Sequence, residues 1–212
     1  MLWFLLAAQM SSGSTDGHPT DVRALFSYND MPAYLLRGGD MSRTVYTRTT
    51  IRDDGKLQSC EAEISSGDPK LDAYTCAIIV KRGKFFPGKG RDGAVIYTVL
   101  RFPVNWTITG ANPPRVERPI VPDLDLSVNR LPKRAGKLIA LALETEVDDQ
   151  GHIVTCAELP PMKGDRHPHF PELVPTVCQQ AVKSLTLRPP QDRSGRATRS
   201  IQTVSVRVRA DG

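Results

Sequence analysis

Aromatic residues, long apolar runs and metal-type cysteine motifs are all scarce in this 212-residue chain. Aromatic side chains make up 6% of it, so a core must be built mainly from Val, Ile, Leu and Ala. The apolar run at residues 2–10 is shorter than the roughly 20 residues that a transmembrane helix requires. The four cysteines include no C-x₂-C pair, which argues against a structural zinc site.

The composition is otherwise that of a globular protein, with 40% hydrophobic and 24% charged residues. The net charge of +5 permits attraction to anionic partners, but most Lys and Arg residues are interspersed with Asp and Glu. The one basic cluster comprises Lys81, Arg82, Lys84, Lys89 and Arg91. We expect no nucleic-acid partner, because few aromatic residues are available for base stacking.

The N-terminus has the length pattern of an export signal. The apolar residues 2–10 precede a polar stretch at 11–17, as in a secretory signal peptide. A basic region before the apolar run and a clean cleavage site are missing, so either the signal is atypical or the true start lies upstream. The alternative is a frayed apolar N-terminus of a cytosolic protein. We expect residues 1–20 to be signal-like and the protein to be exported to the periplasm.

An internal repeat is the most specific feature of the sequence. Each copy has a turn ending in Gly, a Cys five residues later, a second Cys, a Pro eleven residues after it and a Gly six residues further on. These landmarks are Gly55, Cys60, Cys76, Pro87 and Gly93 in the first copy, and Gly151, Cys156, Cys178, Pro189 and Gly195 in the second. Only the interval between the cysteines differs, at 16 and 22 residues. The repeat predicts a tandem duplication.

Each copy is predicted to contain a strand, a hairpin turn, a second strand, a helix and a last strand. The expected strands are 44–51, 56–64 and 94–102 in the first copy, and 137–147, 152–159 and 199–209 in the second. The helices are expected to start at Asp68-Pro69 and Phe170-Pro171 and to end before Pro87 and Pro189. Short helical pieces are expected at 32–37 and near 129–133.

The predicted fold class is therefore α+β, with two small tandem modules. Each module is expected to hold a three-stranded antiparallel sheet with one or two helices on one face. The modules are expected at 21–108 and 126–212. The segment 109–125 contains four prolines and is predicted to be the linker between them.

The cysteines are predicted to pair within each copy. Four cysteines allow three pairings, and the repeat favours Cys60–Cys76 and Cys156–Cys178. Each bridge would join the second strand to the helix and stabilise its module by about 3 kcal/mol. Four buried free thiols are the alternative.

Residues 30–106 resemble the C-terminal domain of TonB-family energy transducers. The resemblance is carried by Met31-Pro32-Ala33, Asp53-Asp54-Gly55, Ser65-Ser66-Gly67, Leu71-Asp72, Phe85-Phe86-Pro87-Gly88-Lys89 and Gly93. The second copy keeps Asp148-Asp149-Gln150-Gly151, Arg188-Pro189-Pro190 and Gly195 but lacks Ser-Ser-Gly. Met31 stands where the family usually has Tyr. The chain also shows no anchor and no long Pro/Lys/Glu-rich spacer before the module, so we expect a soluble periplasmic relative.

The resemblance implies binding of a protein or peptide by strand pairing at an open sheet edge, within TonB-dependent transport across the cell envelope. Segments of outer-membrane receptors are the partners it suggests, and edge pairing into homodimers is a further outcome. The expected binding residues lie on and beside the last strand of the first module: Val95, Tyr97, Val99, Arg101, Lys89 and Arg91. The alternative is that the last strands are covered by the other module, or blunted by Arg199, Arg207 and Arg209.

The sequence predicts no catalysis and no cofactor. His167 and His169, with Asp165, form the one arrangement that could hold a metal, but such a pair beside prolines is typical of a solvated loop. Ser65 and Ser66 have no His or Lys at a spacing that would activate them, and residues 83–93 lack the P-loop pattern. A secreted enzyme or metal-binding protein with a site near His167 and His169 is the alternative function.

Overall fold

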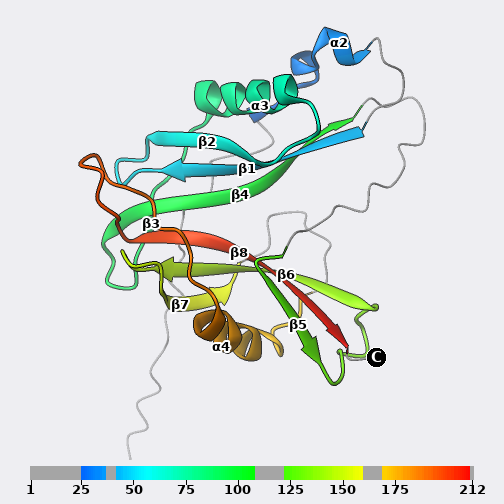
Figure 1. Ribbon diagram of the computed structural model, residues 1–212, viewed down its shortest axis with the longest axis vertical. Coiled ribbons are helices and arrows are strands. Elements are labelled where there is room, and N and C mark those ends of the chain that lie inside the picture. Colours follow the sequence, from blue (N-terminus) through cyan, green and yellow to red (C-terminus); the bar gives the residue numbers. More distant parts are fainter. Residues whose placement is uncertain (1–24, 37–41, 108–121, 160–168, 211–212) are drawn as a thin grey trace, which may run out of the picture.

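The strands of both halves of the chain join in one eight-stranded sheet (Figure 1). The computed structural model describes residues 25–36, 42–107, 122–159 and 169–210. The elements are η1 (Tyr28–Asp30), α2 (Ala33–Leu36), β1 (Ser42–Ile51), β2 (Leu57–Ile64), α3 (Pro69–Arg82), β3 (Gly88–Lys89), β4 (Val95–Thr107), β5 (Leu124–Val128), β6 (Leu138–Val147), β7 (Ile153–Glu158), α4 (Val174–Ser184) and β8 (Ser200–Ala210). The mixed α+β class is confirmed.

The sheet order is β2-β1-β4-β8-β6-β7, with β3 paired to β4 and β5 paired to β8. All pairs are antiparallel except β4–β8 and β5–β8, which are parallel. The expected order of strand, hairpin, strand, helix and strand occurs in both halves. The expectation of two separate sheets differs from this arrangement, because β4 and β8 pair directly.

Two sequence expectations differ from the structure, and others fall on residues that it does not describe. The last strand of the first half continues five residues beyond Phe102, to Thr107. No helix forms near 129–133, because β5 pairs with the end of β8 just before it. The signal-like segment 1–20 and most of the predicted linker lie outside the described residues. Within the described ranges, no helix is long and apolar enough to cross a membrane.

Both hairpins depend on an Asp side chain and a glycine with positive φ. In the β1–β2 turn, Asp54 accepts a hydrogen bond from the Lys56 amide and Gly55 has φ +75°. In the β6–β7 turn, Asp148 accepts from the His152 amide and Gly151 has φ +93°. An Asp that bonds its own backbone and a Gly in the left-handed region are the residues that such turns favour.

Each helix is tied to the neighbouring strand by a disulfide. The predicted pairs Cys60–Cys76 and Cys156–Cys178 are both present, and no cysteine is free. Asp68 caps α3 by accepting hydrogen bonds from the amides of Lys70 and Leu71. The Ser65-Ser66-Gly67 motif leads into this cap, and Ser65 and Ser66 both donate to the buried Asp72 carboxylate.

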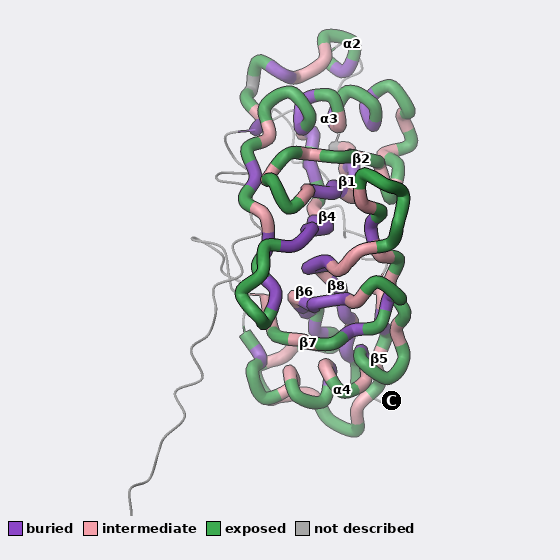
Figure 2. The backbone as a smooth tube through the Cα atoms, turned by 90° about the vertical axis from the view of Figure 1, so that its left-hand side faces the viewer, coloured by how far each residue is buried: buried purple, intermediate pink, exposed green. Residues whose placement is uncertain are grey.

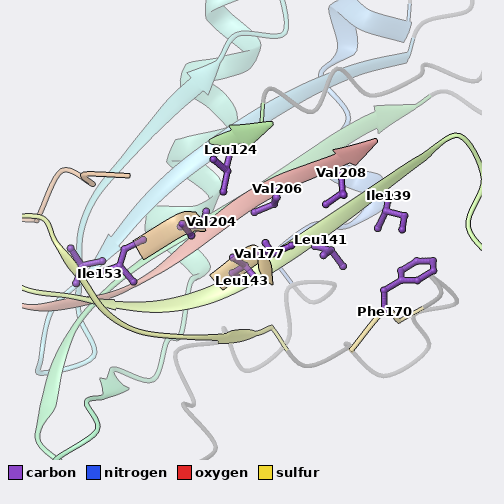
Figure 3. Close-up of a cluster of buried hydrophobic side chains, with 12 residues drawn as sticks. Leu124, Ile139, Leu141, Leu143, Ile153, Phe170, Val177, Val204, Val206 and Val208 are labelled. Carbon is purple, nitrogen blue, oxygen red and sulfur yellow. The ribbon is translucent and has the colours of Figure 1, made fainter. Parts of the chain in front are cut away.

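Two hydrophobic cores lie on opposite faces of the sheet. The first, under α3, consists of Leu35, Val45, Ile51, Leu71, Ile78, Ile79, Phe85, Leu100, Val104 and Trp106. The second, under α4, consists of Leu124, Ile139, Leu141, Leu143, Val147, Ile153, Phe170, Val177, Ala181, Val204, Val206 and Val208 (Figure 3).

The register between β4 and β8 explains this arrangement. Thr98 pairs with Ile201, and paired residues point to the same face. The even-numbered residues of β4 and the odd-numbered residues of β8 therefore share a face. Because Leu100 packs under α3 and Val204 under α4, the helices cover opposite faces. In two views α3 lies beyond β2 and α4 beyond β7, at the two ends of the sheet (Figures 1 and 2).

Candidate partner-binding surface

The strands β4 and β8 pair only at their beginnings and then diverge. Tyr97, Thr98 and Val99 pair with Ser200, Ile201 and Gln202. Beyond this point β8 pairs with β5, whereas β4 continues with β1 as its one strand neighbour in the described part of the chain. We call residues 101–105 of β4 the open edge.

The direction of the backbone groups follows from one hydrogen bond. Thr47 Oγ1 on β1 donates to the carbonyl oxygen of Phe102 at 3.0 Å, so this carbonyl faces β1. Backbone groups in an antiparallel pair alternate in direction. Arg101, Pro103 and Asn105 therefore direct their backbone groups away from β1, toward the open side.

Pro103 sits where a proline is tolerated in a strand. Its missing N–H falls on the open side, so the pairing between β1 and β4 continues unbroken through Tyr46↔Pro103. The open edge thus offers the amides of Arg101 and Asn105, and three carbonyls, to a pairing strand. The proline shortens the stretch that can pair and limits unspecific edge association.

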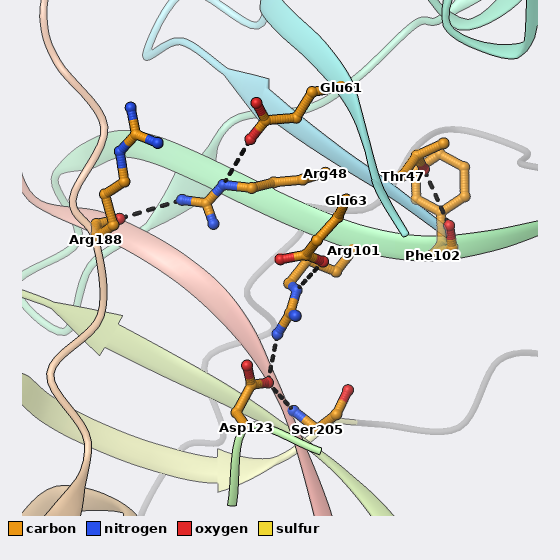
Figure 4. Close-up of polar contacts among 9 residues, drawn as sticks. All are labelled: Thr47, Arg48, Glu61, Glu63, Arg101, Phe102, Asp123, Arg188 and Ser205. Atoms are coloured by element: carbon orange, nitrogen blue, oxygen red, sulfur yellow. Dashed lines mark hydrogen bonds and ion pairs between the residues drawn. The ribbon is translucent and has the colours of Figure 1, made fainter. Parts of the chain in front are cut away.

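A salt-bridge network lies where β4 and β8 diverge (Figure 4). Arg101 donates to Glu63 Oε2 at 2.6 Å and forms an ion pair with Asp123, which also accepts from the Ser205 amide at 2.7 Å. Burial lowers the pKa of Arg101, but the Glu63 hydrogen bond and the Asp123 charge outweigh it, and the pKa is raised overall. Arg101 therefore joins β2, β4 and the segment before β5.

Arg48 on β1 lies beside this network. Its guanidinium is 3.5 Å from Glu61 and donates to the carbonyl oxygen of Arg188 at 3.2 Å. Burial lowers the pKa of Arg48, and the nearby Glu63 and Glu61 charges oppose that shift. The sheet face opposite α3 is thus polar, and its charged side chains pair with groups of the same chain.

Arg101, one of the six predicted binding residues, belongs to the salt-bridge network, and the other five separate into two groups. Tyr97 and Val99 are buried, with 5% and 0% exposure, and they pair with β8. Burial also raises the pKa of Tyr97. The expectation that β4 is an edge strand here is wrong, because β8 occupies that edge. Lys89, Arg91 and Val95 are exposed, and Lys89 pairs with Val95 between β3 and β4.

The loops between helix and last strand cross onto the opposite half. In the first half, the Arg91 amide donates to Glu146 at 2.9 Å. In the second half, Arg193 contacts Asp54 at 2.6 Å, and the carbonyl of Gln191 accepts from Gln58 at 3.0 Å. The alternative in which one half covers the last strand of the other therefore describes residues 97–99 correctly.

Neither histidine that the structure describes has a metal-type environment. His152 lies 3.4 Å from Asp148, and His169 Nδ1 lies 3.2 Å from Glu158. In the described ranges no three His, Cys, Asp or Glu side chains are grouped to hold a metal. His167 and Asp165 lie outside the described residues, so a site there stays a hypothesis.

Sequence reasoning missed the divergence of β4 from β8. The parallel pairing depends on two strands about 100 residues apart, and no local pattern encodes it. Pro103 was an available signal, because a proline inside a β-run indicates an edge position.

Comparisons with protein families, curated proteins and solved structures find no match for this chain. The TonB resemblance therefore stays a prediction that depends on the residues quoted above.

Proposed function

We propose that this chain is an exported TonB-like protein that binds an extended segment of a partner protein by strand pairing. The observation that carries the proposal is the open edge: from Arg101 to Asn105, β4 has a strand on one side only within the described residues. Open edges are the sites at which extended peptides add to sheets.

Export is supported by the two disulfides. Paired cysteines form and persist in oxidising compartments such as the periplasm, and all four cysteines here are paired. The periplasm is therefore part of the proposal, with segments of outer-membrane receptors as the suggested partners.

The hypothesis that the chain holds two TonB C-terminal-like modules is supported by equivalent backbone contacts in its two halves. The Lys89↔Val95 pair has a counterpart in the bridge Gln191↔Ala197. In both pairs the first residue lies thirteen residues after the second cysteine of its half, and the second residue lies nineteen residues after it. The turn bond from Gly55 to Arg52 likewise matches that from Gly151 to Asp148. Two independent stretches of backbone thus repeat the same geometry.

The position of the site predicts a short recognition segment. A pairing strand can bond the Arg101 and Asn105 amides, but it loses one bond at Pro103. We therefore expect a segment of about five residues whose affinity depends strongly on its side chains.

The test uses the disulfide-intact protein purified from the periplasm. Its amide NMR spectrum is recorded with synthetic peptides from the N-terminal and plug regions of outer-membrane receptors of the same organism. We expect one or more peptides to perturb the Arg101 and Asn105 amides and to slow their hydrogen exchange. Asn105→Pro should weaken that binding at least tenfold, because it removes the second outward amide.

The control for Asn105→Pro is its thermal unfolding curve, which must match the unmodified protein for the comparison to count. Binding that persists unchanged in a folded Asn105→Pro variant would place the site elsewhere. An absence of binding by every peptide would contradict the proposed function.

A further inference from the structure

The contact between β4 and β8, which we call the seam, is short compared with its neighbours. It spans Tyr97–Val99 on β4 and Ser200–Gln202 on β8. By contrast, β4 pairs with β1 along Ser42–Ile51, and β8 pairs with β6 along Leu138–Val147. The seam is thus the shortest strand pairing along the order β2-β1-β4-β8-β6-β7.

The two hydrophobic cores do not depend on the seam. The core under α3 and the core under α4 share no residue. Three buried apolar residues of the seam, Tyr97, Val99 and Ile201, and the adjacent Ile96 belong to neither core. Separation of the strands would expose these side chains while leaving both cores packed.

Several polar contacts cross this region, among them Arg101–Asp123 and the hydrogen bond from the Arg91 amide to Glu146. Two of the ion pairs are partly exposed. Arg199, just before β8, contacts Asp92 at 3.0 Å, and their side chains are 39% and 50% exposed. Arg193 contacts Asp54 at 2.6 Å, and 65% of the Arg193 side chain is exposed. Exposed pairs of this kind hold two surfaces together only weakly.

We infer that β8 occupies part of the binding edge of β4 and that the seam opens reversibly to admit a partner strand. This inference rests on the proposed function, since it describes how access to the same edge is controlled. In the closed form, β8 supplies the strand that a partner would supply in the open form. Opening would extend the edge from residues 101–105 back to Tyr97, which adds two outward-facing residues, Tyr97 and Val99, on the near side of Pro103.

The same contact indicates the chemistry of the segment that would bind. The β8 residues at the seam are Ser200, Ile201 and Gln202, and they run parallel to β4. Ile201 fills the space beside Gly88, whose added Cβ would come within 2.7 Å of it. A partner that replaces β8 should therefore run parallel to β4 and place one β-branched apolar residue between two small or polar residues.

The first measurement is native-state hydrogen exchange by NMR on the full, disulfide-intact chain. By the alternation described above, the amides of Tyr97 and Val99 face β8, whereas those of Thr98 and Leu100 face β1. Seam opening predicts that the Tyr97 and Val99 amides exchange at least tenfold faster than the other two. Exchange of all four amides at one rate, equal to that of global unfolding, would overturn the inference.

The second measurement uses a matched pair of variants. In Gly88→Ala the added methyl group overlaps Thr98 Oγ1 and Ile201, so it should push the two strands of the seam apart. Gly136→Ala adds the same methyl group where no atom lies within 4 Å. We expect Gly88→Ala, and not Gly136→Ala, to speed exchange at Tyr97 and Val99 by severalfold.

The binding probe is a fluorescein-labelled peptide with the sequence of residues 199–205, RSIQTVS. We expect it to bind Gly88→Ala at least threefold more tightly than it binds the unmodified protein or Gly136→Ala. Equal affinity for all three proteins would overturn the link between opening and binding.

The two measurements keep the proposals separable. Fast exchange at Tyr97 and Val99 with no binding of any receptor peptide would leave seam opening intact and contradict the proposed function. Binding of a receptor peptide at Arg101 and Asn105, with the seam exchanging only on global unfolding, would support the proposed function and overturn the inference.

Discussion

Arg199, just before β8, donates hydrogen bonds to Asp92, in the turn before β4, at 3.0 and 3.3 Å. The same guanidinium donates to Glu146 on β6 at 2.6 Å. The Glu146 side chain is 2% exposed, whereas that of Asp92 is 50% exposed. These hydrogen bonds raise the pKa of Arg199, and they contribute to lowering the pKa of Asp92. One arginine thus neutralises a buried carboxylate and ties two halves of the sheet together.

The two carboxylates predict an asymmetric mutational response. Arg199→Ala should destabilise the protein by about 2 kcal/mol, because Glu146 would remain buried with the Arg91 amide as its other donor. Asp92→Ala should cost less than about 1 kcal/mol, since a half-exposed pair contributes little. Urea unfolding at neutral pH measures both values. Equal losses in the two variants would contradict the assignment of Glu146 as the dominant partner.

The second prediction concerns Asp30 and Arg82. Arg82 donates to both Asp30 oxygens, at 2.5 and 2.7 Å, and Asp30 is buried. The Arg82 hydrogen bond lowers the pKa of Asp30 despite the opposing effect of burial. Asp30→Asn should therefore destabilise the protein by about 1–2 kcal/mol at pH 7.

The pH dependence of this effect has a defined sign. The unfolded chain binds a proton at Asp30 near pH 4, whereas the folded chain does so only at lower pH. The stabilisation is thus complete above about pH 5 and decreases as the pH falls through the folded-state pKa. Urea unfolding at pH 7, 4 and 2.5 should show the gap between Asp30→Asn and the unmodified protein closing in acid. The exposed Asp149→Asn is the control, and a gap independent of pH would contradict the ion pair.

Features with a local cause were predictable from the sequence. The hairpins at Gly55 and Gly151 follow from turn residues, and the Asp68-Pro69 start of α3 follows from capping preferences. The disulfide partners followed from the repeat. The start of α4 was placed a few residues early, at Phe170-Pro171, because Pro175 also fits a first-turn position.

Features that depend on distant partners were not predictable. Tyr97 and Val99 alternate as they would in an edge strand, and their burial depends on Ser200 and Gln202 about 100 residues later. β5 consists of only five residues beside a proline-rich segment, so its pairing with β8 outweighs a weak local preference. The open edge of β4 thus lies on the predicted strand but mostly beyond the residues expected to bind, and only Arg101 belongs to both sets.

The third prediction compares the two disulfides. Each should stabilise the protein by about 3 kcal/mol, since their loops have similar lengths. Their local effects should differ. α3 buries Leu71, Ile78 and Ile79 and has a side-chain cap, whereas α4 buries only Val177 and Ala181 and has none.

Hydrogen exchange by mass spectrometry distinguishes these effects. The double variant Cys156→Ser/Cys178→Ser should lose protection along α4 under conditions in which the sheet stays protected. Cys60→Ser/Cys76→Ser should retain most of the protection of α3 under the same conditions. Equal loss in both helices would show that the buried side chains of α3 do not hold it independently.

The fourth prediction separates backbone strain from steric overlap at two glycines. Gly151 and Gly195 both have positive φ, at +93° and +82°, so alanine at either position is strained by about 1–2 kcal/mol. A Cβ on Gly195 meets nothing within 4 Å, whereas one on Gly151 overlaps the Leu187 carbonyl oxygen. The Leu187 amide also donates to the Gly151 carbonyl oxygen at 2.8 Å, so the turn and the loop after α4 cannot move apart without losing this bond. Gly195→Ala should therefore cost about 1 kcal/mol and Gly151→Ala about 3 kcal/mol or more by urea unfolding. Similar losses would mean that the loop after α4 can move away from the β6–β7 turn, and that its contact with this turn contributes little to stability.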